Sequence, residues 1–291
     1  MVPTRDRAAL LREAVDSALG QVGVAAEVLV VDDGSAEPVA LPAHPRLRVV
    51  QHLRPRGVSA ARNTGTALAT TPLVAFLDDD DVLRPHMLAR SLAGRQAALD
   101  AGVPGPVGVL SAVAVVDPAG RVEAVRRPPR LSPRGAHFDL EPAEPGASWH
   151  CKQTLVVPRD VLVAIGGFDE SFASRVVTEL FWRLNPVCAL VGLPDVTYEL
   201  RSHPGPRIST DRALRSRSFA RLLRTHRALL RDHPRGYADL LARHARTCVE
   251  ARRPLAAAAA VTRLAGADPT RAARALRAVS PRAGGPGPDP R

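Results

Sequence analysis

The clearest candidates for chemistry are four consecutive aspartates, Asp78 to Asp81, at the end of a short apolar run. The run at 72–77 predicts a short buried strand, whose end would deliver the carboxylates to one edge of a sheet. Carboxylates this close repel one another. A divalent cation with oxygen ligands offsets that repulsion and can bridge to substrate phosphates. The alternative is a solvated acidic turn before the helix that follows Pro85, because acidic residues favour helix N-termini.

The segments on both sides of these aspartates predict an alternation of strands and helices. Strands are predicted at 27–31, 47–50, 72–77, 107–116 and 154–157, with further candidates at 187–193 and 196–201. Helices are predicted at 7–19, 57–70, 85–101 and 177–184 and from 159 onward, with a loop at 117–147. This order predicts an α/β fold with a parallel sheet. Ligands of such sheets bind at the carboxyl ends of the strands, where the aspartates would lie.

The composition limits the partner and the compartment. The chain has 291 residues, of which 45% are hydrophobic and only 3% aromatic, so a sizeable aliphatic core is expected. The net charge of +11 is carried by arginines, with Lys152 as the single lysine. This charge suits nucleotides, nucleic acid or anionic membranes, unless it reflects compositional bias alone.

The cysteines and the apolar runs favour a cytoplasmic protein. Cys151, Cys188 and Cys248 have neither CxxC nor zinc-site spacing, so we expect a reducing compartment. Residues 1–6 do not resemble a signal peptide, and no apolar run reaches membrane-spanning length. The inner face of the membrane is a further expected location, because the arginine-rich segment at 211–280 could bind anionic lipid.

Five short motifs occur in order along the chain. They are Pro3-Thr4-x-Asp6-Arg7, Val31-Asp32-Asp33-Gly34-Ser35, Gly57-Val58-Ser59-x-Ala61-Arg62-Asn63-x-Gly65, Phe76-Leu77-Asp78-x-Asp80-Asp81 and Gly166-Gly167-Phe168-Asp169-Glu170. Together they resemble family 2 glycosyltransferases of the GT-A fold over roughly residues 3 to 203. The resemblance implies a mixed, mostly parallel sheet with flanking helices. It also implies transfer of a sugar from a nucleoside diphosphate sugar to an acceptor hydroxyl.

The resemblance assigns nucleotide-sugar contacts to residues that match the motifs. These residues are Pro3, Thr4, Arg5, Asp32, Asp33, Arg62, Asp78 and Asp79. Pro3, Thr4 and Arg5 would flank the base, and a carboxylate of Asp32-Asp33 could accept a hydrogen bond from a base N–H or a ribose hydroxyl. The alternatives are a simple turn at Asp32-Asp33 and a surface charge at Arg62.

The resemblance also implies a divalent cation, Mn2+ or Mg2+. Asp78 and Asp80 would hold it, with Asp81 in support. The cation would stabilise, as a Lewis acid, the charge that develops on a departing diphosphate. His203 matches a histidine that some relatives bring to the metal or the diphosphate, although a single histidine can equally be a surface or core residue.

The chain departs from the family pattern where relatives carry a Glu-Asp pair. Counting back from Arg183, that place is occupied by Val176-Val177. An inverting transferase needs a carboxylate that accepts the proton of the acceptor hydroxyl, a contribution of about 10²- to 10⁴-fold that valine cannot make. Glu179 is the first candidate for this base, followed by Asp169 and Glu170. A degenerate site is the alternative.

These observations predict four segments and one principal function. The nucleotide-sugar-binding half is expected at 1–105, the acceptor-binding half at 106–210, a helical appendage at 211–280 and a disordered Gly/Pro-rich tail at 281–291. The expected function is metal-assisted, inverting transfer from a UDP-sugar to a glycan or lipid-linked acceptor in cell-surface glycan synthesis. The alternative from another class is a non-catalytic nucleotide-sugar-binding or scaffold protein.

Two further functions fit the sequence less well. A nucleotidyltransferase would carry a glycine-rich, basic phosphate loop after the first strand, and residues 3–7 contain none. Nucleic-acid binding would call for aromatic residues among the basic helices, and these are lacking, so no nucleic-acid partner is expected.

Two expectations concern the ends of the chain. Arginine faces and Leu/Ala stripes share the helices of 211–280, which therefore either pack on the domain or lie on an anionic membrane. At the other end, relatives carry a full apolar strand before Pro-Thr, whereas this chain offers only Met1 and Val2. A central strand pairs on both sides, so we expect a chain extended upstream by roughly five to ten residues to be more stable.

Overall fold

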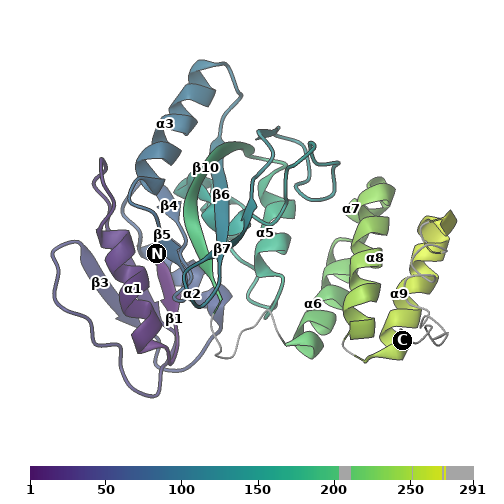
Figure 1. Cartoon of the computed structure of the whole chain (residues 1–291), viewed down its shortest axis with the longest axis horizontal. Coiled ribbons are helices and arrows are strands. Elements are labelled where there is room, and N and C mark those ends of the chain that lie inside the picture. Colours follow the sequence, from purple (N-terminus) through teal and green to yellow (C-terminus); the bar gives the residue numbers. More distant parts are fainter. Residues whose placement is uncertain (203–210, 251, 271, 273–291) are drawn as a thin grey trace, which may run out of the picture. The chain divides into compact units, whose positions relative to one another are not determined.

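Two sheets meet at the N-terminal strand in the computed structural model, which describes residues 1–202, 211–250, 252–270 and 272 (Figure 1). The chain divides into two compact units, Met1–Pro206 and Arg207–Arg291. His203 and the tail at 281–291 lie outside the described residues, so the expectations for them remain predictions.

The first sheet consists of three parallel strands in the order β1-β2-β3. They are β1 (Val2–Thr4), β2 (Val28–Asp32) and β3 (Leu47–Gln51). The register pairs Thr4 with Asp32 and Asp32 with Gln51, so the three strands end level with one another. Their carboxyl ends therefore form one edge, and Asp32-Asp33 lies at it.

The second sheet has seven strands that run in mixed directions. Its main order is β4-β9-β6-β10-β5, with β7 beside β6 and β8 beside β10. The strands are β4 (Leu73–Ala75), β5 (Val82–Leu83), β6 (Val107–Val116), β7 (Val122–Arg126), β8 (Leu131–Ser132), β9 (Val156–Pro158) and β10 (Ala189–Arg201). β10 runs parallel to β6, whereas β9 is antiparallel to both β4 and β6.

Two sequence-based boundaries were wrong in this sheet. The strands predicted at 187–193 and 196–201 form one strand, β10, whose register against β6 shifts between Leu193 and Val196 without a break. Such an irregularity lets a strand pass a proline, so Pro194 does not end it. The predicted loop at 117–147 contains β7 and β8. β7 lacks the apolar alternation of a buried strand because its first four residues are exposed.

Met1 joins the two sheets. Its α-amino group donates a hydrogen bond of 3.0 Å to the carbonyl oxygen of Ala75, and its carbonyl accepts one of 3.1 Å from the amide of Leu77. Both bonds follow the pattern of a parallel ladder, so β1 lies between β2 and β4. The acidic residues that follow β2 and β4 therefore lie on either side of Thr4.

Helices cover both faces of β2. Val30 packs in the core cluster that contains the buried side of α1 (Ala8–Leu19), whereas its neighbour Val31 packs with Ala61 of α2 (Val58–Leu68). Burial of each such valine contributes roughly 1.5–3 kcal/mol. The unbroken apolar run at 28–31 thus reflects burial on two faces. The other helices of this unit are α3 (Met87–Asp100), α4 (Arg159–Ala164), α5 (Val176–Leu184) and the 3-10 turn at Lys152–Thr154.

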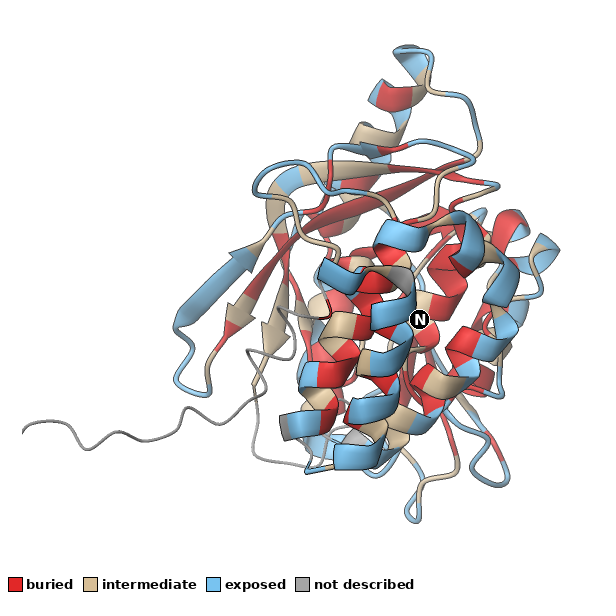
Figure 2. Cartoon of the chain, turned by 90° about the vertical axis from the view of Figure 1, so that its right-hand side faces the viewer, coloured by how far each residue is buried: buried red, intermediate tan, exposed pale blue. Residues whose placement is uncertain are grey.

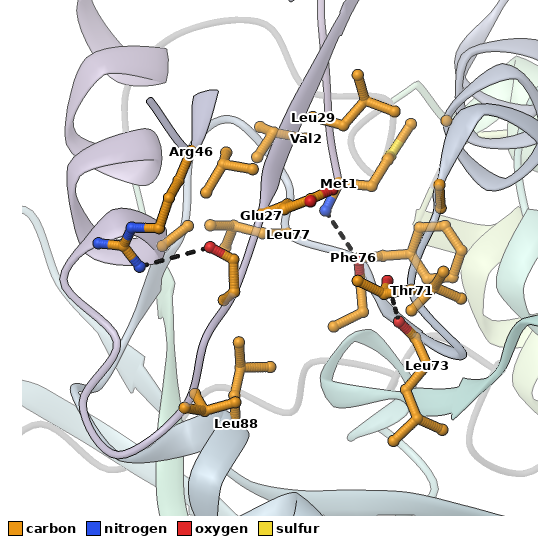
Figure 3. Close-up of a pocket in the computed structure, with 18 of the residues that line it drawn as sticks. Met1, Val2, Glu27, Leu29, Arg46, Thr71, Leu73, Phe76, Leu77 and Leu88 are labelled. Carbon is orange, nitrogen blue, oxygen red and sulfur yellow. Dashed lines mark hydrogen bonds between the residues drawn. The ribbon is translucent and has the colours of Figure 1, made fainter. Parts of the chain in front are cut away.

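A cavity of ≈ 530 Å³ lies at the amino ends of β2 and β4. Figure 3 shows Met1 on one side of it and Glu27, Leu29, Leu73 and Leu88 around the remainder. The aspartates follow the carboxyl ends of the same strands, so the cavity and the acidic edge lie at opposite ends of the sheet. The cavity is therefore not the site that the motifs build.

The second unit is helical. Its helices among the described residues are α6 (Arg212–Thr225), α7 (Arg227–Asp232), α8 (Pro234–Glu250) and α9 (Pro254–Ala267). α8 packs against the other three, with Phe219, Leu241 and Leu264 buried, and exposed residues line the outer sides of the helices (Figure 2). Residues 207–291 hold 19 arginines and six acidic residues, so this unit carries all of the chain's net positive charge. None of the helices in the described part of the chain is long and apolar enough to cross a membrane.

Candidate functional site

The acidic stretch forms a tight turn after β4. The amide of Asp81 donates a hydrogen bond of 3.2 Å to the carbonyl oxygen of Asp78. Carboxylate oxygens of Asp78, Asp80 and Asp81 lie within 4.8 Å of one another. Three carboxylates at this spacing supply the hard oxygen ligands that Mg2+ and Mn2+ take, so these residues fit a divalent cation.

Residues of β10 hold Asp81 in place. The Tyr198 hydroxyl donates to one carboxylate oxygen at 2.8 Å, and the amide of Arg201 donates to the other at 2.9 Å. Burial raises the pKa of Asp81 well above its usual value, and the charges of Asp78 and Asp80 raise it further. Burial likewise raises the pKa of Tyr198 well above its usual value, so its hydroxyl keeps the proton that it donates. Tyr198 and Arg201 therefore fix the orientation of the Asp81 carboxyl group within the turn.

Asp79 points inward, away from this group of three. Its Oδ2 accepts a hydrogen bond of 2.8 Å from the Thr4 hydroxyl, and its Oδ1 lies 3.0 Å from Nη1 of Arg7. Burial raises the pKa of Asp79, and the hydrogen bond from Thr4 and the charge of Arg7 oppose that rise. The structure thus gives Asp79 and Thr4 an internal contact, and their predicted contact with the nucleotide sugar stays a prediction.

Arg62 on α2 reaches the acidic turn. Its Nη2 lies 2.5 Å from Oδ1 of Asp78, and its guanidinium carbon lies 5.4 Å from the centre of the Phe168 ring. Arg62 is buried, yet its Nε meets no hydrogen-bond acceptor among the described residues. A buried guanidinium with an unused donor is suited to a phosphate oxygen.

Asp32 carries the clearest unused acceptor at this edge. Its Oδ1 accepts hydrogen bonds from the amide and the hydroxyl of Ser35, at 2.9 and 2.6 Å. Its Oδ2 is buried without a hydrogen-bond donor in the part of the chain that the structure describes. Such a group costs roughly 1–3 kcal/mol when it stays unsatisfied, so a ligand that donates to it recovers free energy.

Asp33 instead organises the neighbouring loop. Its Oδ1 lies 2.8 Å from Nδ1 of His52 and accepts from the amide of Arg56, and its Oδ2 accepts from the amide of Gly57 at 2.7 Å. Nε2 of His52 lies 2.9 Å from the hydroxyl of Thr64, which ties the loop to α2. Asp33 therefore positions the start of the helix that carries Arg62.

The other two predicted base contacts differ in exposure. Pro3 is buried within β1, whereas the Arg5 side chain is 53% exposed and lies 3.4 Å from the carboxylate of Asp6. Only Arg5 is therefore open to a ligand in this conformation.

Glu179, the first candidate base, forms a buried ion pair. Its two carboxylate oxygens accept from Nε and Nη2 of Arg183 at 2.7 and 2.6 Å, and Glu179 is 2% exposed. Arg183 also donates to the carbonyl oxygens of Ile165 and Gly167, at 2.7 and 2.8 Å. The pair thus braces the turn that precedes Phe168. These contacts favour a structural part for Glu179, and its role as the base stays a prediction.

Asp169 and Glu170 lie on that braced turn. Asp169 is half-buried, and its Oδ1 accepts from the amide of Ser171 at 2.8 Å. The ring of Phe168 meets Phe76 edge-on, with ring centres 5.1 Å apart. Phe76 lies two residues before Asp78, the first residue of the acidic turn. Asp169 directly follows Phe168, whose ring packs against Phe76.

The segment that contains this edge matches a known protein family. The profile of glycosyl transferase family 2 matches residues 1–105, the segment that contains Asp32, Arg62 and the acidic turn. This match confirms the resemblance to family 2 glycosyltransferases that the five motifs predict. Among relatives of this chain, the pre-mycofactocin glycosyltransferase of Mycobacterium tuberculosis is 36% identical over 192 residues, which is 63% of this chain and 38% of that protein. The succinoglycan biosynthesis protein ExoO of Rhizobium meliloti is 44% identical over 96 residues, which is 30% of this chain and 28% of that protein.

The fold of this chain is also found in solved structures. TarS of S. aureus, in a crystal structure with UDP-GlcNAc, superposes with a TM-score of 0.55 at 16% sequence identity. The match covers 96% of this chain and 88% of that one, and it confirms the expected GT-A fold. The chain spans less than half the length of the two sequence relatives, from Mycobacterium tuberculosis and Rhizobium meliloti.

Sequence reasoning missed several residues around this acidic edge. Arg7 and Asn63 stand within the motifs but were given no role. His52 and Tyr198 stand outside the motifs, and their partners Asp33 and Asp81 are distant in sequence. The Glu179–Arg183 pair had a usable signal, because a glutamate four residues before an arginine on a helix predicts an ion pair.

Proposed function

We propose that this protein transfers a sugar from a nucleoside diphosphate sugar to an acceptor hydroxyl. The observation that carries the proposal is the acidic turn, where Asp78, Asp80 and Asp81 approach within 4.8 Å beside the buried guanidinium of Arg62. In the reaction, the acceptor oxygen bonds to the anomeric carbon, the bond to the diphosphate breaks, and a base takes the hydroxyl proton. Negative charge then grows on the diphosphate, where Arg62 and a cation would face it.

The donor fits a UDP-sugar. The unpaired Oδ2 of Asp32 is suited to accept the N3–H of a uracil or a ribose hydroxyl. A neighbour in fold, TarS, has been crystallised with UDP and with UDP-GlcNAc. The expected acceptor is a hydroxyl of a cell-surface glycan or of a lipid-linked glycan, as relatives of this chain act in succinoglycan biosynthesis.

Mn2+ or Mg2+ would supply Lewis-acid stabilisation of the diphosphate when bound. Asp78, Asp80 and Asp81 would hold it. Tyr198 and Arg201 keep Asp81 oriented, and Arg62 keeps Asp78 oriented. A base on the turn at Asp169 would make the transfer inverting, by accepting the hydroxyl proton opposite the leaving group.

Binding of the donor tests this proposal most directly. Calorimetry with UDP and Mn2+ should show binding that requires the cation, and Asp78→Ala and Asp80→Ala should each abolish the cation-dependent part without unfolding the protein. Asp100→Asn, at the exposed end of α3, is the matched control and should bind as the unaltered chain does. Unchanged cation-dependent affinity in both alanine variants would remove the acidic turn from the site.

A non-catalytic nucleotide-sugar-binding or scaffold protein is the second candidate. Val176-Val177 at the place of the family's acidic pair and the burial of Glu179 against Arg183 favour it. Donor binding without transfer to any acceptor, and without slow hydrolysis of the donor, would support this second function over the first.

The expected location is the cytoplasm, at the inner face of the membrane. The second unit supports this, because its excess of arginines suits anionic lipid.

A further inference from the structure

Arg7 makes an ion-pair contact with two members of the acidic turn. Its Nη1 lies 3.0 Å from Oδ1 of Asp79 and 3.1 Å from Oδ2 of Asp80. The Arg7 side chain is 26% exposed, and those of Asp79 and Asp80 are 8% and 11% exposed. The contact is therefore largely shielded from water. Charges in such a place interact more strongly than charges at an exposed surface.

The position of Arg7 is electrostatically unfavourable for its own helix. It is the N-cap residue of α1, and its side chain makes no capping hydrogen bond. A positive charge at a helix N-terminus opposes the helix dipole. The acidic turn offsets this cost, so the guanidinium is held there by Asp79 and Asp80 rather than by α1.

Asp80 is thus shared between two positive charges. It pairs with Arg7, and it also belongs to the group of three carboxylates that fits a divalent cation. A carboxylate that accepts a hydrogen bond from a guanidinium is a poorer ligand for a divalent cation at the same time, because the two positive charges repel each other.

We propose that Arg7 competes with the divalent cation for Asp80 and so sets the affinity of the site for that cation. When the cation binds Asp80, Arg7 keeps its ion pair with Asp79, because Asp79 is not one of the three carboxylates that would bind the cation. Arg7 is then a positioning residue that keeps the empty turn charge-balanced. This inference rests on the proposed metal-assisted function.

Titration with Mn2+ alone tests the competition. Free Mn2+ is measured by electron paramagnetic resonance, so the readout does not depend on sugar transfer. Arg7→Met should bind Mn2+ about fivefold more tightly than the unaltered chain, the scale of a partly exposed ion pair. Arg7→Lys keeps the charge but lacks the guanidinium fork, and its affinity should lie between the two. Arg12→Met, at an exposed position of α1, is the matched control and should change nothing.

A double-mutant cycle separates competition for Asp80 from a general charge effect. The Asp80→Asn background keeps a side-chain oxygen and should still bind Mn2+, weakly but measurably. In that background, the gain from Arg7→Met should disappear, because the carboxylate for which Arg7 competes is gone. A gain that persists in that background, or an Mn2+ affinity of Arg7→Met equal to or below that of the unaltered chain, overturns the inference. If Arg7→Met does not fold, the comparison rests on Arg7→Lys, and an affinity no higher than that of the unaltered chain overturns it.

The inference and the proposed function can fail separately. If no form of the chain binds Mn2+, the competition is overturned, whereas sugar transfer that continues in a chelator would leave the transferase proposal in place. If Arg7→Met gains Mn2+ affinity but no nucleotide sugar binds, the competition stands and the transferase proposal fails.

Discussion

Asn63 on α2 holds both backbone polar groups of Phe168. Its side-chain amide donates to the carbonyl oxygen of Phe168 at 2.9 Å and accepts from the amide of Phe168 at 2.8 Å. These two residues are 105 positions apart, and they connect the motif on α2 that contains Arg62 to the Gly-Gly-Phe-Asp-Glu turn. A β-carbon at Gly167 would lie 2.5 Å from the Asn63 Oδ1, so the close approach also requires glycine there.

The first prediction is that Asn63→Asp loosens this turn. The carboxylate can still accept from the Phe168 amide but can no longer donate to its carbonyl, and it adds a charge 3.0 Å from Glu170. We expect a loss of roughly 1–3 kcal/mol in the free energy of unfolding. We also expect faster amide hydrogen exchange at 166–170. Both are measured by denaturant titration and by exchange with mass spectrometry.

Asn185→Asp provides the comparison, because the side-chain amide of Asn185 likewise donates to backbone carbonyl oxygens, those of Pro133 and Cys188. It should lower stability by a similar amount without faster exchange at 166–170. If both variants speed amide exchange at 166–170 equally, the hydrogen bonds of Asn63 do not specifically stabilise this turn.

The second prediction separates the candidate bases. Asp169→Asn should lower turnover by at least about 10²-fold with little change in melting temperature or donor binding, because it removes a proton acceptor from an already braced turn. Glu179→Gln should instead lower the free energy of unfolding by roughly 1–3 kcal/mol, because Arg183 loses its buried counter-charge. Steady-state kinetics and thermal melting measure the two effects.

The reverse pattern would restore Glu179 as the base. Turnover lost in Glu179→Gln at unchanged stability, together with an active Asp169→Asn, would contradict the structural assignment. Glu170→Gln is the control on the same turn, since Glu170 is exposed and already contacts Arg56 and Asn63.

The acidic turn could be located from the sequence because its signal is local. An apolar run that ends in charge fixes both the strand and the position of its end, and the same holds for β2 and Asp32. The contacts that orient these carboxylates could not be predicted, because Tyr198 and Asp81 are 117 positions apart. Strands β7 and β8 were missed because pairing with β6 and β10, rather than their own burial, defines them. The Glu179–Arg183 ion pair, in contrast, could have been predicted from its spacing of four residues on a helix.

The third prediction concerns the second unit and anionic lipid. Arg217, Arg221 and Arg224 are exposed and recur every three to four residues along α6, so they share one side of that helix. The full chain should sediment with phosphatidylglycerol vesicles at low salt and remain in solution at high salt. Replacing the three arginines by glutamine should weaken binding by about 3 kcal/mol, at about 1 kcal/mol for each basic residue near the surface.

Phosphatidylcholine vesicles and a chain that ends at Ser209 provide the controls. The full chain should not sediment with phosphatidylcholine vesicles, and the shortened chain should not sediment with phosphatidylglycerol vesicles. The shortened chain should still bind UDP, because the acidic edge lies within the first unit. Absence of sedimentation of the full chain at low salt would exclude the lipid partner. Binding to nucleic acid but not to vesicles would assign the basic helices to a different partner.

The last prediction concerns the cavity beside Met1. The α-amino group donates to Ala75 inside the sheet, and burial lowers its pKa from 8.0 to about 6. The unfolded chain therefore binds a proton between pH 8 and pH 6 that the folded chain does not, so stability falls by roughly 2–3 kcal/mol as the pH drops through that window. A preceding strand residue, continuing the ladder, would instead place its own N–H and C=O opposite Leu73 and Ala75.

A chain extended before Met1 by roughly five to ten residues of alternating Val, Ile and Ser should fill this cavity with paired backbone and apolar side chains. We expect a higher melting temperature, tighter UDP binding and loss of the stability change between pH 8 and pH 6, because a neutral peptide group replaces the amine. An extension of equal length with proline at alternate positions is the matched control, because it cannot continue the ladder. Equal melting temperatures and equal pH dependence in the extended and unextended chains would falsify this prediction, since the added residues would then not pair as a strand within the cavity.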